Sequence, residues 1–204
     1  MSWKLASTAP GLSQLEAELQ AASDSEFKKI LASATLTSNQ QIEIEAPAGE
    51  LASREVRYYR VRVRTDAGWS GYSQALRYEA GLLSGDEFVG SAIGDDSKHS
   101  EPATLLRKDF EVSSKPVSAR LYITGHGVFE LSLNGISVAD EFLNPGWTAY
   151  QARLNVATFD VSHLVRAGKN AIGVTLADGW HRGKMGFMSK YDNYGPHTSV
   201  LLQL

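Results

Sequence analysis

The chain has 204 residues and a formal net charge of −3, from 20 basic and 23 acidic side chains. This near balance gives no general attraction to nucleic acid or to an anionic membrane surface. The sequence contains no cysteine, which excludes disulfide bonds, thiolate metal sites and cysteine nucleophiles.

The first segment with a regular pattern, residues 14–22, fits two structures. Its apolar residues recur at positions 15, 19 and 22 with helical spacing, and at 15, 17, 19 and 21 with the alternation of a strand. Because Ala, Leu, Glu and Gln are good helix formers, propensity alone favours a helix. Residues 41–45 (QIEIE) then predict a short strand that ends before Pro47.

Residues 57–65 are the strongest strand candidate of the first half. Tyr59 and two valines fall on one face, and three arginines at positions 60, 62 and 64 fall on the other. The arginine row fits either a phosphate-binding stripe or a solvated sheet face with acidic partners on the next strand. We favour the solvated face. Residues 75–79 predict its partner strand.

Residues 81–98 are rich in Gly, Ser and Asp, which predicts a linker and a loop leading into a second domain. Strands follow at 103–113, 117–125 and 129–133, and the last of these runs into Asn134-Gly135. Both residues tolerate positive φ, as a tight type I′ hairpin requires. Further strands are predicted at residues 154–161, 171–177 and 200–204.

Four ordered motifs make the second half specific: FELSLNG (129–135), NPGWTAY (144–150), GKNAIGVTL (168–176) and ADGWHRGKMGF (177–187). Residues 88–204 resemble the N-terminal module of bacterial α-L-rhamnosidases of glycoside hydrolase family 78. In the first half, YYRVRVR (58–64) and GYSQALRYEAG (71–81) resemble the fibronectin type III-like domain that leads these enzymes. The resemblance implies a strand, and not a helix, at residues 14–22.

The resemblance implies an all-β chain with two antiparallel β-sandwiches. A fibronectin type III-like domain would occupy residues 1–80, a linker 81–98, and a jelly-roll module, cut short at its C-terminal end, 99–204. The catalytic (α/α)6 barrel of the family would lie outside this chain, so we expect the chain to be inactive and its parent to hydrolyse terminal α-L-rhamnosides. A sandwich that lacks its last strands exposes a sheet edge, which predicts self-association.

Sugar binding is the local chemistry that the second half favours, because sugars stack C–H faces on aromatic rings and bond their hydroxyls to charged or amide groups. The substrate-binding candidates are Trp147, Tyr150, Asp178 and Trp180, with Tyr191 and Tyr194 also in loops. The alternative is structural: the indoles pack under the rim with their N–H groups bonded to backbone, and the NPGW and DGW segments are turns.

Related modules bind L-rhamnose through calcium, which prefers carboxylate, amide and backbone oxygens. The resemblance therefore gives Asp140 and Asn193 as candidate calcium ligands, with Asp178 behind them, and no cofactor is required. The five histidines, His99 among them, show no zinc-binding spacing.

Two functions follow as hypotheses. In the first, the chain is a carbohydrate-binding module for L-rhamnose or rhamnosides. In the second, it is a structural module that packs on the catalytic domain and stabilises it. No apolar run approaches the roughly 20 residues that span a bilayer, and no signal peptide is visible. We therefore expect a cytoplasmic protein with no nucleic-acid or membrane partner.

Overall fold

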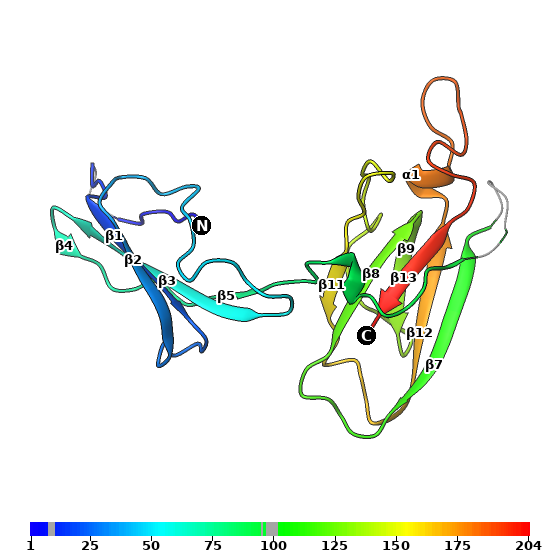
Figure 1. Ribbon diagram of the computed structural model, residues 1–204, viewed down its shortest axis with the longest axis horizontal. Coiled ribbons are helices and arrows are strands. Elements are labelled where there is room, and N and C mark those ends of the chain that lie inside the picture. The colour runs from blue at the N-terminus through cyan, green and yellow to red at the C-terminus, as the bar shows by residue number, and fades with distance from the viewer. Residues whose placement is uncertain (8–10, 95, 97–101) are drawn as a thin grey trace. The chain divides into compact units, whose positions relative to one another are not determined.

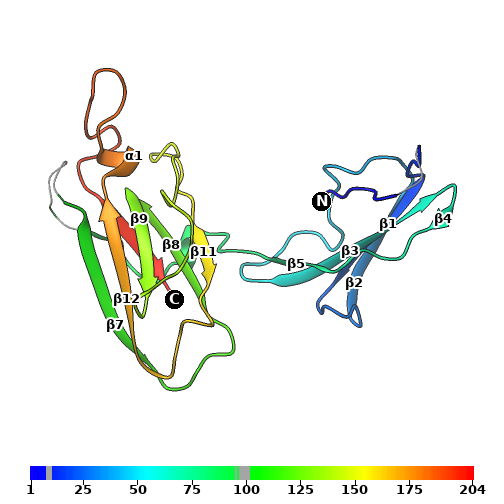
Figure 2. The same ribbon diagram turned by 180° about the vertical axis from the view of Figure 1, so that it is seen from behind.

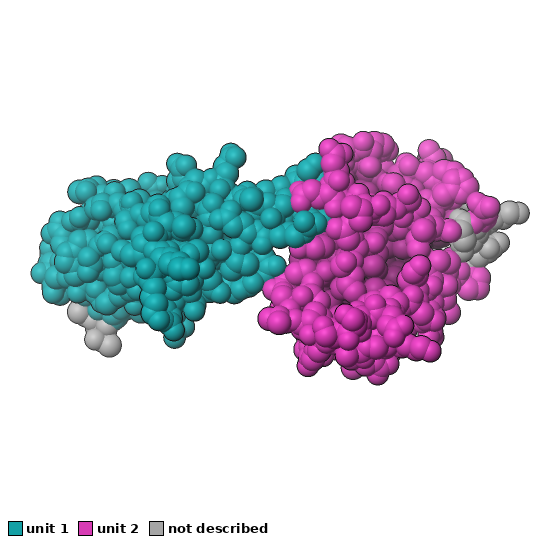
Figure 3. All heavy atoms as spheres, turned by 60° about the horizontal axis from the view of Figure 1, so that its bottom comes forward, with its two compact units in different colours: residues 1–84 teal, residues 85–204 magenta. Residues whose placement is uncertain are grey.

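A computed structural model describes residues 1–7, 11–94, 96 and 102–204 of the chain. His99 lies outside the described residues, as do parts of the linker predicted at 81–98. The chain divides into two compact units, Met1–Ser84 and Gly85–Leu204, which Figure 3 shows in teal and magenta. The strands pair antiparallel in both units, so the all-β prediction is confirmed.

The first unit holds one five-stranded antiparallel sheet in the order β2-β1-β3-β4, with β5 also paired to β3. Its strands are β1 (Glu16–Ala22), β2 (Ile30–Leu36), β3 (Val56–Thr65), β4 (Gly68–Trp69) and β5 (Leu76–Glu79). The segment that propensity favoured as a helix is thus strand β1. Leu19 and Tyr59 are buried on the sheet, and the tertiary environment overrides local propensity there.

Residues 41–45, predicted as a strand, are bends and coil. They are held by residues 1–3 through two backbone bonds, Trp3 N to Gln41 O (3.0 Å) and Ile44 N to Met1 O (3.0 Å). The fully buried Gln14 fixes the same region, because its Nε2 donates to Ser38 O at 2.8 Å. The strand prediction for this segment is therefore wrong. Alternating Ile and Glu did not show that the segment lacks the regular backbone hydrogen bonds of a sheet.

The arginine row on β3 faces partners across the sheet, as the solvated-face interpretation predicted. Arg62 and Arg64 pair with Glu18 and Glu16, which lie directly opposite them on β1. Aromatic rings fill the spaces between the arginines and make a ladder in the order Phe27, Arg60, Tyr72, Arg62 and Trp69. Its cation-to-ring distances are 4.1, 4.0, 4.9 and 4.9 Å. The arginines therefore stabilise a sheet face and are not free for phosphate.

The second unit is a sandwich of two four-stranded antiparallel sheets, which Figures 1 and 2 show from opposite sides. One sheet has the order β10-β9-β12-β7: Ile136–Ser137, Val128–Leu133, Gly168–Ala177 and Thr104–Val112. The other has the order β11-β8-β13-β6: Ala157–Asp160, Arg120–His126, Ser199–Gln203 and Ile93–Gly94. A 3-10 turn, Gly85–Glu87, precedes β6, and a four-residue helix α1, Gly179–Arg182, follows β12.

The core of this unit lies between its two sheets. Leu121 and Ile123 of β8 meet Leu133 of β9 and Leu176 of β12, all at most 1% exposed. From Asn170 onward, strand β12 alternates buried and half-buried residues, as a strand with one core face requires. The strand ends and the loops between them lie at the edge of this sandwich, and we call this edge the rim.

The hairpin at Asn134-Gly135 forms as predicted, with φ values of 55° and 80°. Asn134 also has a role that turn chemistry did not reveal. Its Nδ2 donates to Leu164 O and to Asn170 Oδ1, both at 2.9 Å, and its Oδ1 accepts from Ala171 N at 3.0 Å. The turn is thereby joined to β12 and to the loop before it.

Strand β13 is an interior strand of its sheet. It pairs with β8 on one side and, at Ser199 and Val200, with β6 on the other. Beyond that pairing, the Gln203 side chain accepts from Val89 N at 2.8 Å and donates to Glu87 O at 3.2 Å. Self-association through an exposed sheet edge stays a prediction, and β6 covers the outer side of β13 only at Ser199 and Val200. In the described part of the chain, no helix is long and apolar enough to cross a bilayer.

Candidate functional site

The short helix α1 places Trp180 on the rim of the second unit, directly after β12. The start of α1 lies close to strand β9, and this close contact depends on Gly179, whose φ is 51°. A Cβ at this position would lie 2.5 Å from Val128 Cγ1 of β9. Only a residue without a side chain can therefore bring the start of α1 this close to the sheet.

Trp180 and Trp147, two of the predicted sugar-binding residues, lie together. Their rings are parallel within 5°, with centroids 6.3 Å apart. Trp147 is 56% exposed and Trp180 is half-buried. The Trp147 Nε1 donates to the hydroxyl of Tyr194 at 3.0 Å, which fixes the orientation of the exposed ring. We call this pair the tryptophan platform; it lines an open groove together with Leu143, Lys184 and Met185.

Tyr150, a third predicted sugar contact, lies in a buried layer. It is 7% exposed, and its hydroxyl donates to Gly146 O at 3.3 Å. Its ring meets the edge of His181 at 5.1 Å and lies 4.9 Å from the ring of Tyr194. This position favours the structural interpretation of Tyr150, with a polar tip bonded to the backbone.

Asp178, the fourth predicted contact, forms an ion pair with Arg182 on α1. The distance from Asp178 Oδ1 to Arg182 Nη2 is 2.6 Å, and Arg182 is 3% exposed. A buried guanidinium needs such a partner, because an unpaired charge is costly away from water. The ion pair of Asp178 with Arg182 therefore stabilises α1, the helix that carries Trp180.

Two histidines lie side by side next to Tyr150. The ring centroids of His126 on β8 and His181 on α1 are 4.7 Å apart. His181 is 5% exposed, and its Nδ1 has no hydrogen-bond partner within the described residues. Burial, together with the charges of His126 and Arg182, lowers the pKa of His181 to about 4, and burial also lowers the pKa of His126. Both rings are therefore neutral at neutral pH.

The segment after α1 projects from the rim as a hairpin, seen in Figure 1 as the orange loop beyond α1. Met185 and Lys190 pair at its base through backbone bonds of 3.0 and 3.1 Å. Phe187 and Met188 at its tip are fully or almost fully exposed, at 104% and 89%. Asn193, predicted as a calcium ligand, donates from Nδ2 to Lys190 O at 3.0 Å and to Gly183 O at 3.3 Å, and so fixes the hairpin.

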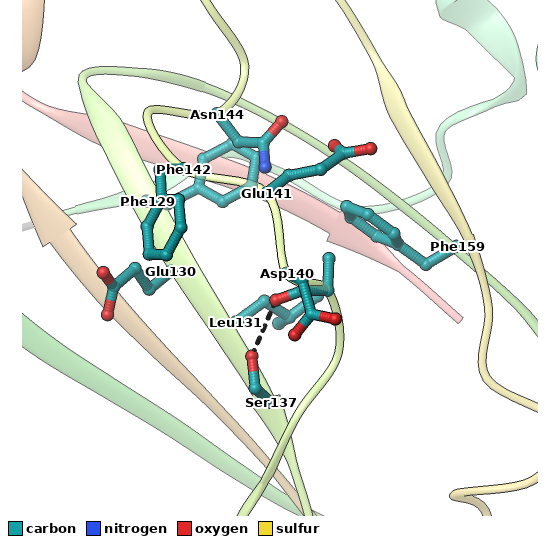
Figure 4. A pocket seen from close by; sticks show the side chains of 10 residues that line it. Phe129, Glu130, Leu131, Ser137, Asp140, Glu141, Phe142, Asn144 and Phe159 are labelled. Carbon is teal, nitrogen blue, oxygen red and sulfur yellow. Dashed lines mark hydrogen bonds between the residues drawn. The ribbon is translucent and has the colours of Figure 1, made fainter.

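Asp140, the other predicted calcium ligand, lines a separate pocket beside β9, which Figure 4 shows. We call it the phenylalanine pocket, after Phe129, Phe142 and Phe159 in its wall. Among the described residues, no group of three Asp, Glu, His or Cys side chains is arranged to hold a metal ion. Calcium also takes amide and backbone oxygens, so its binding through Asp140 and Asn193 stays a prediction.

Several residues of the rim were not predicted from the sequence. His126 on β8 and His181 on α1 are 55 positions apart in the sequence, and the fold brings their rings together. Phe142 lies in the loop after β10, and Phe159 lies on β11. Pattern analysis of single segments carries no signal for such long-range neighbours.

The family model for the α-L-rhamnosidase N-terminal domain matches residues 114–204, and the model for the Rha78A-like N-terminal immunoglobulin domain matches residues 1–84. The chain belongs to the α-L-rhamnosidase family. It carries two N-terminal domains of that family, which confirms the resemblance found in the motifs. The first is described as immunoglobulin-like, so its fibronectin type III character stays a prediction, as does the jelly roll of the second.

Individual relatives agree with this assignment. An α-L-rhamnosidase of Formosa agariphila is 34% identical over 82% of this chain, and one of Streptomyces avermitilis is 37% identical over 68%. The crystal structure of an α-L-rhamnosidase from Aspergillus terreus superposes with a TM-score of 0.87 at 30% identity, over 98% of this chain. The chain spans 19%, 12% and 24% of these three proteins, respectively.

Proposed function

We propose that this chain is a non-catalytic part of an α-L-rhamnosidase and that its second unit binds carbohydrate at the tryptophan platform. Hydrolysis of the rhamnoside would belong to the rest of the longer protein. The observation that carries the proposal is the parallel pair of Trp147 and Trp180, with Trp147 56% exposed over an open groove.

A flat indole surface suits a pyranose ring, because axial C–H groups of the sugar pack against the face of the indole. The hydrogen bond from Trp147 to Tyr194 orders the ring in the free protein. Such ordering lowers the entropy lost on binding. Lys184 beside the groove supplies a hydrogen-bond donor for sugar oxygens.

Isothermal titration with L-rhamnose tests this proposal, since the family's substrates end in this sugar. Trp147→Ala should reduce affinity at least about tenfold, as expected when a stacking residue at the centre of a site is removed. Trp69→Ala is the matched control, because Trp69 is also an exposed tryptophan (42%) but lies in the first unit. Equal affinity of the wild type and Trp147→Ala would rule out the platform as the site.

A second candidate function has its own observation, the hairpin tip with Phe187 and Met188. Fully exposed apolar side chains on a projecting hairpin suit insertion into another protein surface. The occupant we propose is the remainder of the parent rhamnosidase, since the chain spans only a fraction of the length of its relatives. In this function the chain stabilises the catalytic domain.

The parent enzyme tests the second function. Replacing Phe187 and Met188 with Ser should lower the melting temperature of the parent while leaving that of the 204-residue chain unchanged. Val117→Ser is the matched control, because Val117 is an equally exposed apolar residue (102%) outside the hairpin. An unchanged melting temperature of the doubly substituted parent would contradict docking through this hairpin.

A further inference from the structure

Strand β2 is the outer strand of the sheet in the first unit. Within the described residues it pairs with β1 alone, and no other segment forms a backbone hydrogen bond to Ile30–Leu36. The alternate N–H and C=O groups of an edge strand point away from its sheet and are free to pair with another strand. We propose that two copies of this chain associate through β2, antiparallel about a two-fold axis, to form one continuous sheet.

The other long edge strands carry charged side chains. Among the described edge strands of more than two residues, only β2, with the sequence ILASATL, has no charged residue. Arg77 lies on β5, Asp160 lies on β11, and Lys108 lies in the middle of β7. Charged side chains on an edge strand oppose its pairing with another chain. Strand β2 lacks this protection and is therefore the edge open to a second copy.

The part of β2 that can pair regularly is residues 32–36. The register between β1 and β2 is regular over these five residues and shifts between Ala21 and Ala22 of β1, opposite the start of β2. An irregularity of this kind bends a strand and interrupts its ladder. The shared ladder of the dimer is therefore confined to these five residues.

The two faces of this part of β2 differ in chemistry. The buried residues of β1 point to the core, and the residues directly opposite them on β2 are Ala32, Ala34 and Leu36. Residues that lie directly opposite each other share a face of the sheet. Ser33 and Thr35 therefore lie on the other, wet face, and both are exposed.

A two-fold axis at Ala34 matches this pattern with itself. Ala34 then faces its own copy, Ala32 faces Leu36 of the second copy, and Ser33 faces Thr35 of the second copy. Each apolar residue thus meets an apolar residue and each hydroxyl meets a hydroxyl, without opposed like charges. Apart from Leu36 these side chains are small and offer no pocket that would select a foreign strand. A second copy of the chain is therefore the occupant that fits.

The hairpin that carries β2 is fixed before association. The Asp24 carboxylate accepts from Lys28 N at 3.1 Å and from Lys29 N at 2.7 Å, which closes the turn between β1 and β2. An ordered strand loses less entropy on binding. Ile30 and Leu31, 47% and 50% exposed, flank the ladder and add apolar area to the contact.

Sedimentation equilibrium of the 204-residue chain tests the proposal. A five-residue ladder is small beside stable interfaces of roughly 1,200–2,000 Å², so the average mass should rise from one chain toward two only between about 10 µM and 1 mM. Ser33→Lys/Thr35→Lys places lysines opposite lysines across the axis and should stay monomeric. A wild type that is monomeric at about 1 mM, or equal association of this double lysine variant, would overturn the proposal.

The matched control is Ser113→Lys/Ser114→Lys, which adds the same charge at two exposed serines of the second unit. It should associate as the wild type does, and a monomeric control would contradict pairing through β2. Because all four substituted positions are exposed, both double variants should keep the thermal unfolding of the wild type.

Two further variants test the register. Ser33→Glu/Thr35→Glu should be monomeric by itself and should associate with the double lysine variant, because unlike charges then meet across the axis. The chain has no cysteine, so Ala34→Cys gives two thiols that face each other at a spacing a disulfide can bridge. Oxidised glutathione should link Ala34→Cys into dimers at least about tenfold faster than Ser113→Cys. Equal cross-linking rates, or glutamate and lysine variants that do not associate when mixed, would refute the antiparallel pairing at Ala34.

Discussion

His181 lies against His126 with ring centroids 4.7 Å apart, and burial lowers the pKa of both rings. Arg182 lies beside the pair and adds positive charge, while Asp192 opposes it only weakly. Tyr150 and Tyr194 supply the other neighbouring rings. The pair thus joins β8 to the helix that carries Trp180.

We expect the stability of the chain to fall as the pH drops from about 6.5 to about 4. The pKa of His181 is about 4 in the folded state against an ordinary value of 6.5, so the unfolded state binds more protons in this window. The loss amounts to roughly 3 kcal/mol when complete. Urea unfolding at pH 7.5 and 4.5 measures it.

His181→Phe should remove most of that pH dependence. His163→Gln, an exposed histidine, is the control and should behave as the wild type. A variant without His181 that loses as much stability on acidification as the wild type would show that other groups carry the effect.

The Asp178 ion pair allows its structural role to be separated from a role in sugar binding. Asp178→Asn should destabilise the chain by about 3 kcal/mol, because it leaves the buried Arg182 guanidinium without its carboxylate. Thermal unfolding measures this loss, and at low temperature, where the variant is folded, affinity for L-rhamnose should change little. A variant of wild-type stability that no longer binds the sugar would instead make Asp178 a ligand contact.

The arginine ladder of the first unit should contribute to stability through its rings. Tyr72→Ala removes the ring between Arg60 and Arg62 and the hydroxyl that donates to Glu18 at 2.7 Å. We expect a loss of about 2–3 kcal/mol, from two cation–π contacts and one charge-assisted hydrogen bond. Tyr72→Phe keeps the ring and should lose less than half of that. If both variants lost the same amount in urea unfolding, the rings of the ladder would contribute nothing.

Asn134 should contribute more to the stability of the chain than a turn residue usually does. Asn134→Ala removes three hydrogen bonds to Leu164, Asn170 and Ala171, for an expected loss of about 2–3 kcal/mol. Gly135→Ala should lose only about 1 kcal/mol, because a Cβ there meets no atom within 4 Å and the change adds backbone strain alone. Thermal unfolding of both variants measures the two losses of stability. A larger loss in Gly135→Ala than in Asn134→Ala would contradict the role given to the Asn134 side chain.

Alternation and turn chemistry were sufficient to predict most strands of this chain, because one face of each sheet is buried and the other is wet. They failed where local and tertiary preferences disagree. Residues 16–22 have helix-forming composition yet form β1, since Leu19 and its neighbours are buried against the sheet. Residues 41–45 alternate like a strand but form no named strand; their backbone bonds to Met1 and Trp3 hold them instead.

The candidate site was predictable only in part. Aromatic residues in loops pointed to Trp147 and Trp180, and the structure brings these two together. The same criterion also selected Tyr150, which is buried, because a sequence does not show which face of a loop residue is covered. The ion pair of Asp178 with Arg182 has the spacing of one helical turn, but α1 is too short for its pattern to be recognised.

The most direct test of the proposed function is isothermal titration of L-rhamnose into the 204-residue chain, in the presence of calcium and again with a chelator. The account predicts saturable binding, with a dissociation constant on the order of 1–10 mM for a monosaccharide on an exposed platform. It predicts the same affinity in both solutions and a loss of this binding in Trp147→Ala. No binding up to about 50 mM sugar in either solution would contradict carbohydrate binding and leave docking on the catalytic domain as the function.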